Sequence, residues 1–556
     1  MSTAPTRKLT RLQVGALPLI RSVLGRLRLR QILLEHIPSS DRQPFPRADL
    51  LVLLVVNLAL AKDPLYQLAE WVDSLDLRAL GYGPRPAHPL SDDGFARALD
   101  KLYEADRSSL LTRLVVSAIK AFDIRSERIH NDSTSIKAYG RIPGSTRTGL
   151  ELRRGHSKDH RPDLKQLVYS LSVSDDGAVP VHHRVYPGNR NDETTHIETW
   201  EALCRIHGSA NFIYVADCKL CTQEQLSHIV GRGGKAITIV PEGRVEVRRF
   251  YDQLRAGPVP KKLLWRRPKP NYPGTTDSFY LYEGTYFTEH GHYPLYWLSS
   301  SEKTQRDRLD RQERLELAEG KLAQLAPKLN RYHLKRRPEI RAAAKAILDH
   351  YRVEGLIDLR LPRHMHVTRQ RPRGRPPGQK VVYRYERRVS YSLHWSRNTQ
   401  ALAAQARIDG VFPLLCTDSG VEPKAVVQAY KFQARLEKRF CQFKSVQRAA
   451  PLLFKKIQRV EANMFIFFIA LLVQALLERE LRQKLEQRHA PPLKLYPEER
   501  DAPHPTTSQV FKTFDRLCTY AITEEGQLRE QYHDELTETH RAVLSLLGIA
   551  EREFWN

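Results

Sequence analysis

The chain has 556 residues, of which 41% are hydrophobic and only six are cysteine, with a formal net charge of +26 and a pI near 9.8. This length suffices for two to four domains with substantial cores, and so few cysteines exclude a disulfide scaffold and indicate a reducing compartment. The charge indicates a polyanionic partner, with nucleic acid ranked before an acidic membrane surface.

Residues 1–125 predict an N-terminal helical domain. Helix-spaced leucine, isoleucine and valine recur over residues 14–37, and residues 48–61 are nearly all apolar. The run Ser91-Asp92-Asp93 is expected to cap a helix that ends near Tyr103, and either Asp106 or Ser108 to cap one that ends near Phe122. The role of this domain stays open between DNA binding and dimerisation, because no recognition helix stands out.

Residues 126–240 predict the first part of a mixed α/β domain, because strand patterns alternate there with two helical segments. The strands are expected at residues 128–132, 167–173, 178–186, 212–217 and 236–240, and the helices at 193–206 and 222–230. Asp132 and Asp217 each end an expected buried strand. Ligand sites of open α/β sheets gather at the carboxyl edge of the strands, so both acids are candidate site residues.

Residues 241–405 predict a basic insertion domain with short strands, one of them at residues 245–251, and a helical hairpin made by residues 303–325 and 338–351. Within it, Arg373 and Arg375 lie in a Pro-Arg-Gly-Arg-Pro run that resembles the core of an AT-hook. An extended Arg-Gly-Arg segment fits the narrow minor groove of A·T-rich DNA. A basic loop that contacts phosphates without sequence preference remains the alternative.

Residues 406–490 predict the second part of the α/β domain, with a strand at 409–417 and helices at 429–445 and 460–481. The apolar run at 464–477 is expected to be too short for a bilayer and to form a buried helix. Glu437 lies on the first helix, beside an apolar stripe. Residues 491–556 predict a helical C-terminal tail.

Asp132, Asp217 and Glu437 form the candidate catalytic set. Three converging carboxylates repel one another, and a divalent cation removes that penalty. Oxygen ligands alone suit Mg²⁺ or Mn²⁺. We therefore predict a metal site held by these three acids.

The helix at 429–445 also carries Tyr430, Glu437 and Lys444 at the spacing of a Tyr-x2-Arg-x3-Glu-x6-Lys signature. This pattern resembles the DDE transposases of bacterial insertion sequences, and within them the insertion-sequence-four superfamily. Gln433 stands where that family usually has Arg, and Arg435 lies close enough to replace its phosphate contact. Residues 155–166 and 187–192 are similar to two further segments of the family, and the resemblance spans residues 14–520.

The resemblance implies a ribonuclease-H-like catalytic domain interrupted by the insertion domain, with Asp132 on its first strand and Asp217 on its fourth. It implies a transposase that binds the ends of its element, cleaves DNA and joins the 3′ ends to target DNA by phosphoryl transfer with two Mg²⁺ or Mn²⁺ ions. Tyr430, Gln433, Arg435 and Lys444 would contact DNA. The expected partners are double-stranded DNA and a second subunit on DNA, with no membrane, in a bacterial cytoplasm at the nucleoid.

Two alternatives remain open at this stage. One is an inactive DNA-binding descendant of a transposase. Decay should damage the three acids, yet all three are present in their expected surroundings in the sequence. The other is a ribonuclease-H-like nuclease that cuts DNA without joining it, which the sequence does not distinguish from a transposase.

Overall fold

The computed structural model describes residues 7–38, 45–61, 63–83, 90–139, 142–155, 161–269, 274–370, 383–447, 454–524 and 527–555. The chain divides into two compact units. Unit 1 comprises Met1–Thr238, Cys416–Asp418 and Ala425–Asn556, and unit 2 comprises Ile239–Leu415 and Ser419–Lys424. Residues 406–415 and 419–424, which were predicted with the second part of the α/β domain, fall in unit 2.

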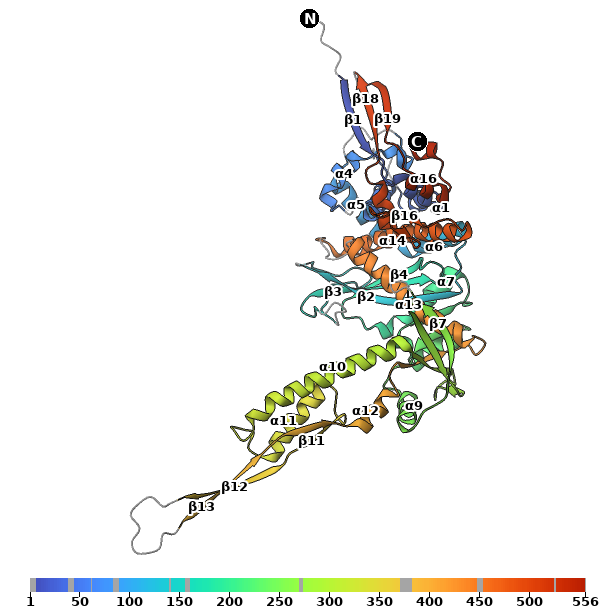
Figure 1. The fold of residues 1–556 in the computed structure, drawn as a ribbon. Coiled ribbons are helices and arrows are strands. Elements are labelled where there is room, and N and C mark those ends of the chain that lie inside the picture. Colours follow the sequence, from blue (N-terminus) through green and yellow to red (C-terminus); the bar gives the residue numbers. More distant parts are fainter. Residues whose placement is uncertain are drawn as a thin grey trace. The chain divides into compact units, whose positions relative to one another are not determined.

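The first part of unit 1 is helical, as predicted (Figure 1). Ser91 Oγ accepts a hydrogen bond from Gly94 N at 3.2 Å, and Asp106 Oδ1 accepts from Ser108 N and Ser109 N, so both predicted N-caps are confirmed. The helices are α1 (Leu17–Leu27), α2 (Leu29–His36), α3 (Arg47–Ala59), α4 (Leu68–Ser74), α5 (Asp92–Glu104) and α6 (Arg107–Phe122), with short 3₁₀ turns η1 (Leu65–Gln67) and η2 (Leu77–Leu80).

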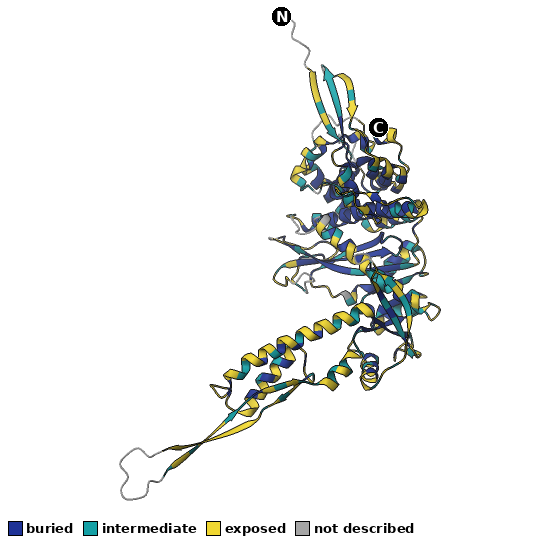
Figure 2. Ribbon diagram, viewed as in Figure 1, coloured by how far each residue is buried: buried dark blue, intermediate teal, exposed yellow. Residues whose placement is uncertain are grey.

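The core of unit 1 is built around α14 (Ile457–Gln487), which packs against α3, α5 and β4 (Pro180–Pro187). The helix is longer than the predicted apolar run, and by length and composition alone it could cross a membrane, so the prediction that it is too short was wrong. Its most apolar window is 94% buried inside the structure, which confirms the predicted buried helix. Figure 2 shows it dark blue along most of its length.

Unit 1 also contains a mixed sheet with the strand order β4-β3-β2-β5-β6. Strand β3 (Lys165–Ser174) runs antiparallel to both of its neighbours, β2 (Arg128–Ala138) and β4, whereas β5 (Ile213–Ala216) and β6 (Lys235–Ile239) run parallel to β2. Helix α7 (His196–His207) follows the 3₁₀ turn η3 (Asp192–Thr194) and connects β4 to β5, and η4 (Cys218–Leu220) with α8 (Gln223–Gly231) connects β5 to β6. All five predicted strands and both predicted helices are confirmed.

The end of the chain is only partly helical. Helices α15 (Thr507–Phe514), α16 (Glu538–Leu547) and α17 (Glu551–Trp555) form there, with a small ladder of β16 (Leu493–Lys494) and β17 (Asp501–Ala502). The predicted helical tail was wrong for β18 (Cys518–Glu524) and β19 (Gln527–His533). These strands form an antiparallel sheet with β1 (Arg7–Gln13), because β-branched and aromatic residues of β18 find a ladder partner more than 500 residues away.

The first helix of unit 2 lies where the sequence predicted a strand. Residues predicted as a strand from Val245 form helix α9 (Val245–Ala256). Val247, Phe250 and Leu254 are its buried residues, and their spacing of three and four is helical, so tertiary burial outweighs the β propensity of the valines.

The rest of unit 2 consists of an antiparallel sheet, a helical hairpin and two ribbons. The sheet has the order β15-β10-β8-β7, with β9 paired to β10. Its strands are β7 (Lys261–Pro268), β8 (Thr276–Tyr282), β9 (Tyr286–Phe287), β10 (Pro294–Ser300) and β15 (Val411–Cys416). The ribbons are β11 (Ile357–Arg360) with β14 (His394–Arg397) and β12 (Arg363–Gln370) with β13 (Arg384–Tyr391), followed by α12 (Thr399–Ala406).

The predicted helical hairpin is confirmed as α10 (Ser301–Leu325) and α11 (Arg337–His350), joined through the 3₁₀ turn η5 (Ala326–Lys328). Leu315 and Leu322 of α10 meet Ile340 and Leu348 of α11 in a separate hydrophobic cluster. This cluster gives unit 2 a core of its own.

Candidate active site

Asp132 and Asp217 lie on neighbouring parallel strands. In the register between β2 and β5, His130 is paired with Val215. Two residues further along both strands, Asp132 comes level with Asp217. Because side chains alternate along a strand, both acids fall on the side of the sheet that carries His130. Asp217 directly follows the carboxyl end of β5, as predicted. Asp132 is the fifth of the eleven residues of β2, so the prediction that it ends a strand was wrong, because β2 continues to pair with β3 as far as Ala138.

Backbone amides hold one oxygen of each carboxylate. Asp132 Oδ1 accepts a hydrogen bond from Ser133 N at 2.7 Å, and Asp217 Oδ1 accepts from Lys219 N at 3.0 Å, which caps η4. His196 Nε2 lies 4.0 Å from the same oxygen of Asp217, whose side chain is 42% exposed. These contacts orient both carboxylates and leave them open to solvent.

Helix α13 (Pro423–Cys441) joins this edge through Gln433. Gln433 Nε2 donates a hydrogen bond to the carbonyl oxygen of Asn131 at 2.9 Å, and Gln433 Oε1 lies 3.3 Å from His130 Nδ1. The ring of Phe432 lies 4.7 Å from the ring of His130. Burial lowers the pKa of His130 to about 4, so its imidazole is neutral at physiological pH and Nδ1–H donates to the amide oxygen. Gln433 thereby ties α13 to the residue before Asp132.

The pKa of Tyr430 depends on its burial and on the charges of nearby acids. Its phenol is largely buried, and burial raises its pKa to about 12. Burial is the largest cause of this rise, and the charges of Asp217, Cys218, Glu437 and Asp132 contribute to it in that order. Glu437 is exposed and lies one helical turn beyond Gln433, on the same side of α13. The Tyr430 phenol is therefore neutral at physiological pH.

The donor set suits a hard divalent cation, because Asp132, Asp217 and Glu437 offer only carboxylate oxygens. In the part of the chain that the structure describes, no three His, Cys, Asp or Glu side chains lie close enough to hold one ion. Asp132 and Asp217 are oriented by backbone amides, whereas Glu437 is an exposed side chain of α13.

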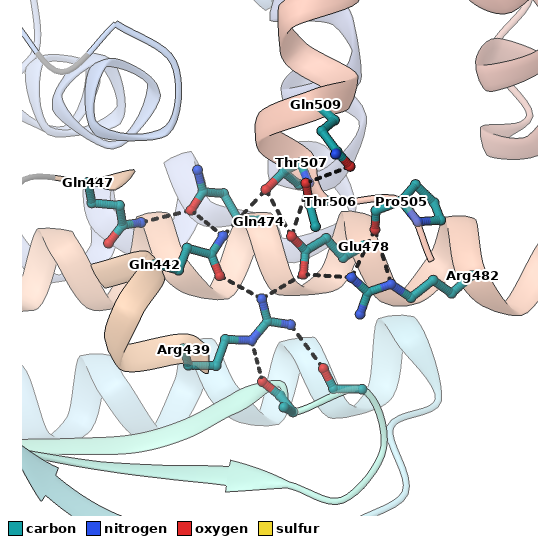
Figure 3. A network of polar contacts seen from close by, with 12 residues as sticks. Arg439, Gln442, Gln447, Gln474, Glu478, Arg482, Pro505, Thr506, Thr507 and Gln509 are labelled. Carbon is teal, nitrogen blue, oxygen red and sulfur yellow. Dashed lines mark hydrogen bonds and ion pairs between the residues drawn. The ribbon is translucent and has the colours of Figure 1, made fainter. Parts of the chain in front are cut away.

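A buried ion pair holds the helix that carries Glu437 (Figure 3). Arg439 follows Glu437 by two residues and is 5% exposed. Its Nη1 donates to Glu478 Oε2 of α14 and to Gln442 Oε1, both at 2.7 Å. Its Nε and Nη2 donate to the carbonyl oxygens of Ala178 and Gly177 in the β3–β4 turn, both at 3.0 Å. One guanidinium therefore connects α13, α14 and the sheet.

Glu478 is the counter-ion at the centre of this network. Its Oε1 accepts from Thr507 N at 3.0 Å, at the start of α15. Burial pushes the pKa of Glu478 upward, but the charges of Arg439 and Arg482 and the Thr507 N–H outweigh it and hold the pKa below its ordinary value. The carboxylate is therefore ionised inside the core, where an ion pair is tolerated only with such hydrogen bonds.

The helix changes form just after the Glu437 segment. Gln442–Val446 is a π-helical turn, so Lys444 does not continue the α-helical spacing from which it was predicted to share a face with Glu437. The turn directs Phe443 into the core, where its ring stacks on Tyr169 at 4.5 Å. Lys444 is half-buried, and Arg435 is exposed with its guanidinium 5.1 Å from the ring centre of Phe432.

Some predicted site residues fall outside the described residues. These are Arg373 and Arg375, together with residues 156–160 of the segment that resembles the insertion-sequence family. Their predicted contacts with DNA stay predictions.

Four residues of the site were missed from the sequence. His130 precedes Asp132 by two residues, and the period of two in a strand is the signal that could have placed it on the same face. Asn131 offers a backbone carbonyl, which no sequence pattern marks. In the sequence Arg439 is one more basic residue on a basic helix. Its partner Glu478 is 39 residues away, so no local pattern marks the pair.

Three comparisons with known proteins were made. A family described as "Domain of unknown function (DUF4277)" matches residues 9–116, within the N-terminal helices. The curated proteins contain no match. A solved piggyBac transposase synaptic complex with hairpin DNA aligns over 88% of this chain and 79% of that chain, at 8% identity and a TM-score of 0.37.

The Mos1 transposase paired-end complex with left transposon end aligns over 36% of this chain, at 13% identity and a TM-score of 0.14. This chain covers 60% of the Mos1 chain. Likenesses of this degree carry no argument about fold or activity, which therefore depend on the sequence and on the geometry above.

Proposed function

We propose that the protein is a DDE transposase that binds the ends of an insertion sequence of the insertion-sequence-four superfamily, cleaves DNA and joins the 3′ ends to target DNA. The observation that carries the proposal is the level placement of Asp132 and Asp217 on adjacent parallel segments, with α13, the helix of Glu437, bonded to the strand of Asp132 through Gln433. These are the acids that the signature on α13 and the strand ends select in the sequence.

The strand arrangement supports a ribonuclease-H-like catalytic domain. Three antiparallel strands are followed by two that run parallel to the first, in the order β4-β3-β2-β5-β6. Asp132 lies on the first strand of this set and Asp217 follows the fourth. Helix α13, which carries Glu437, lies against β2 through Gln433 and Phe432.

Mg²⁺ or Mn²⁺ would be held by Asp132, Asp217 and Glu437. When bound, two such ions activate water or a 3′-hydroxyl and stabilise the leaving oxygen. The protein positions the DNA around them. Tyr430 stays protonated at neutral pH because its pKa is about 12, so it can donate a hydrogen bond to a phosphate oxygen. Arg435 and Lys444 supply positive charge along the same helix.

The formal charge of +26 supports a DNA substrate, because contacts to phosphates supply much of the affinity of DNA-binding proteins. Joining of two element ends calls for a second subunit on DNA, and a bacterial cytoplasm at the nucleoid is the compartment we propose. An inactive descendant or a nuclease that does not join is the alternative. The level placement of Asp132 and Asp217 favours an active site over a decayed one.

The test uses purified protein, labelled DNA from the flanks of the gene, and Mg²⁺ or Mn²⁺. We expect metal-dependent nicking at the element ends, lost in Asp132→Asn and retained in Glu224→Gln, which removes an exposed acid of the same unit. Transfer of the nicked 3′ end into a second DNA distinguishes a transposase from a nuclease. Tight DNA binding without nicking under either metal would point to the inactive descendant.

A further inference from the structure

The ribbon of β12 and β13 has no core. The two strands pair from Arg363↔Tyr391 to Gln370↔Arg384, and in the described structure they form a two-stranded sheet of their own. No residue of either strand is buried, and Figure 2 shows the ribbon mostly yellow. Two-stranded ribbons are marginally stable in water, so a ribbon this exposed indicates a surface that is completed by a partner.

The base of the ribbon is anchored in unit 2. Asn330 Nδ2 donates to the carbonyl oxygen of Tyr391 at 2.9 Å, and Tyr391 N donates back to Asn330 Oδ1 at 2.7 Å. The Tyr391 side chain packs against the hydrophobic cluster of α10 and α11. The ribbon is therefore held firmly at one end and projects its strands from that anchor.

The two faces of the ribbon differ sharply in composition. Side chains alternate between faces, and cross-strand partners share a face. One face, which we call the arginine–apolar face, carries exposed apolar side chains between arginines. Its members are Arg363, Met365, Val367 and Arg369 of β12 and Tyr385, Arg387, Val389 and Tyr391 of β13.

The opposite face is polar, and most of its side chains are hydrogen-bonded to neighbouring side chains. His366 Nε2 lies 2.9 Å from Ser390 Oγ, and Arg388 Nε donates to Glu386 Oε1 at 2.9 Å. Gln370 also donates to Glu386. This face has therefore less need of a partner.

The arginine–apolar face is exposed without such pairing. Met365 is 57% exposed, Val367 55% and Tyr385 61%. Among the residues that the structure describes, no carboxylate forms an ion pair with Arg363, Arg369 or Arg387. The guanidinium of Arg369 lies over the ring of Tyr383, 3.2 Å from its centre, which presents a flat cationic surface.

Charge decides which partner fits. The described strands carry five arginines and one glutamate, so a second copy of the ribbon would place like charges opposite one another. A polyanion that also offers apolar groups would match both the arginines and the apolar side chains of the arginine–apolar face. The major groove of DNA offers phosphates, guanine acceptors for arginine and thymine methyl groups for apolar side chains, and it is wide enough for a two-stranded ribbon.

The spacing along the ribbon agrees with this partner. Antiparallel strands rise about 3.4 Å per residue, which is about the rise of one base step. Residues of one face are two apart, so successive side chains stand roughly two base steps apart. Arg363 and Arg369 would then span about six base steps, with Met365 and Val367 between them.

We propose that the β12–β13 ribbon lies in the major groove of double-stranded DNA with its arginine–apolar face against the base edges. This inference rests on the proposed function, in which the chain acts on DNA, and names the element that reads the DNA. It concerns only the described strands and not the segment that joins them.

The test measures binding of the full chain to a fluorescein-labelled duplex from the flanks of the gene. Arg369→Ala with Arg387→Ala removes two charges from the arginine–apolar face. Arg384→Ala with Arg388→Ala removes the same charge from the polar face and is the matched control. We expect Kd to rise about tenfold or more for the first pair and far less for the control. Wild-type protein should protect guanine N7 from methylation, and the first variant should lose that protection.

A further double variant removes apolar contacts and leaves the charge of the ribbon unchanged. Met365→Ser with Val389→Ser should weaken binding while leaving the salt dependence of Kd unchanged, because no phosphate contact is lost. Equal losses in both arginine pairs would overturn the proposal in favour of charge alone. Wild-type affinity in the first variant, with a change in its sedimentation, would overturn it in favour of a second copy as the occupant. Failure of the wild-type chain to bind any duplex would instead overturn the proposed function itself.

Discussion

Gln433 Nε2 donates a hydrogen bond to the carbonyl oxygen of Asn131 at 2.9 Å, across 302 residues of sequence. The bond joins the helix of one proposed catalytic acid to the strand of another, one residue before Asp132. A side chain expected to contact DNA thus makes its visible contacts inside the protein. We infer that it positions Glu437 relative to the aspartates.

Gln433→Ala should slow metal-dependent nicking by about tenfold to a hundredfold, because small misplacements of catalytic groups cost that much. The salt dependence of DNA binding should stay the same, since a neutral amide releases no counterion. Single-turnover nicking and anisotropy titrations measure the two effects. Gln428→Ala, at an exposed position of α13, is the control. A large loss of affinity with an unchanged nicking rate would instead favour direct contact with DNA.

Glu437→Gln should abolish nicking and preserve DNA binding, because it removes a carboxylate ligand and no positive charge. Loss of nicking below detection at saturating protein, with Kd within about twofold of wild type, is the expected pattern. Glu422→Gln removes an exposed acid just before α13 and should keep full activity. Wild-type nicking rates in Glu437→Gln would refute the triad.

Arg439→Met should lower the free energy of unfolding by about 3–5 kcal/mol, because it leaves Glu478 buried without its counter-ion. Arg439→Met combined with Glu478→Met should recover much of that loss, since the pair is then replaced by apolar volume. Urea unfolding of the wild type, of Arg439→Met, of Glu478→Met and of the double variant measures both effects. Exposed Lys438→Met is the matched control. Additive losses in the double variant would contradict the pairing.

The same ion pair predicts a pH dependence. The pKa of Glu478 is lower in the folded than in the unfolded protein. Its contribution to stability is therefore fully present above the ordinary glutamate pKa and is lost as the pH falls through the folded value. The unfolding free energy of wild type should fall more steeply on acidification than that of the double methionine variant. Parallel curves would show that the depressed pKa of Glu478 does not contribute.

Tyr430→Phe should weaken DNA binding by about tenfold, because it deletes one hydrogen-bond donor to a phosphate. Nicking by wild type should show no inflection between pH 8 and pH 10 from this residue, since the phenol ionises only at about 12. Binding titrations and a pH–rate profile of both proteins test this. An alkaline limb present in wild type and absent in Tyr430→Phe would overturn the role as a neutral donor.

Local patterns predicted most elements of the sheet and helices, because they depend on short-range periodicity. The strands that carry Asp132 and Asp217, the helix of Glu437 and the caps at Ser91 and Asp106 follow from residues within a few positions of one another. The errors arise where distant partners outweigh local preference. Val245–Ala256 is helical because it buries three spaced residues, and Cys518–Glu524 pairs with β1 at the other end of the chain.

The sequence by itself determined which acids are the candidates, because the strand patterns and the α13 signature depend only on residues that are close together in the chain. Only the tertiary structure decided that Gln433 turns to Asn131, that Arg439 is buried against Glu478, and that β12 and β13 expose an arginine–apolar face. The physical reason is that a side chain's partner depends on which element packs against it, and contacts between residues far apart in the chain leave no local pattern.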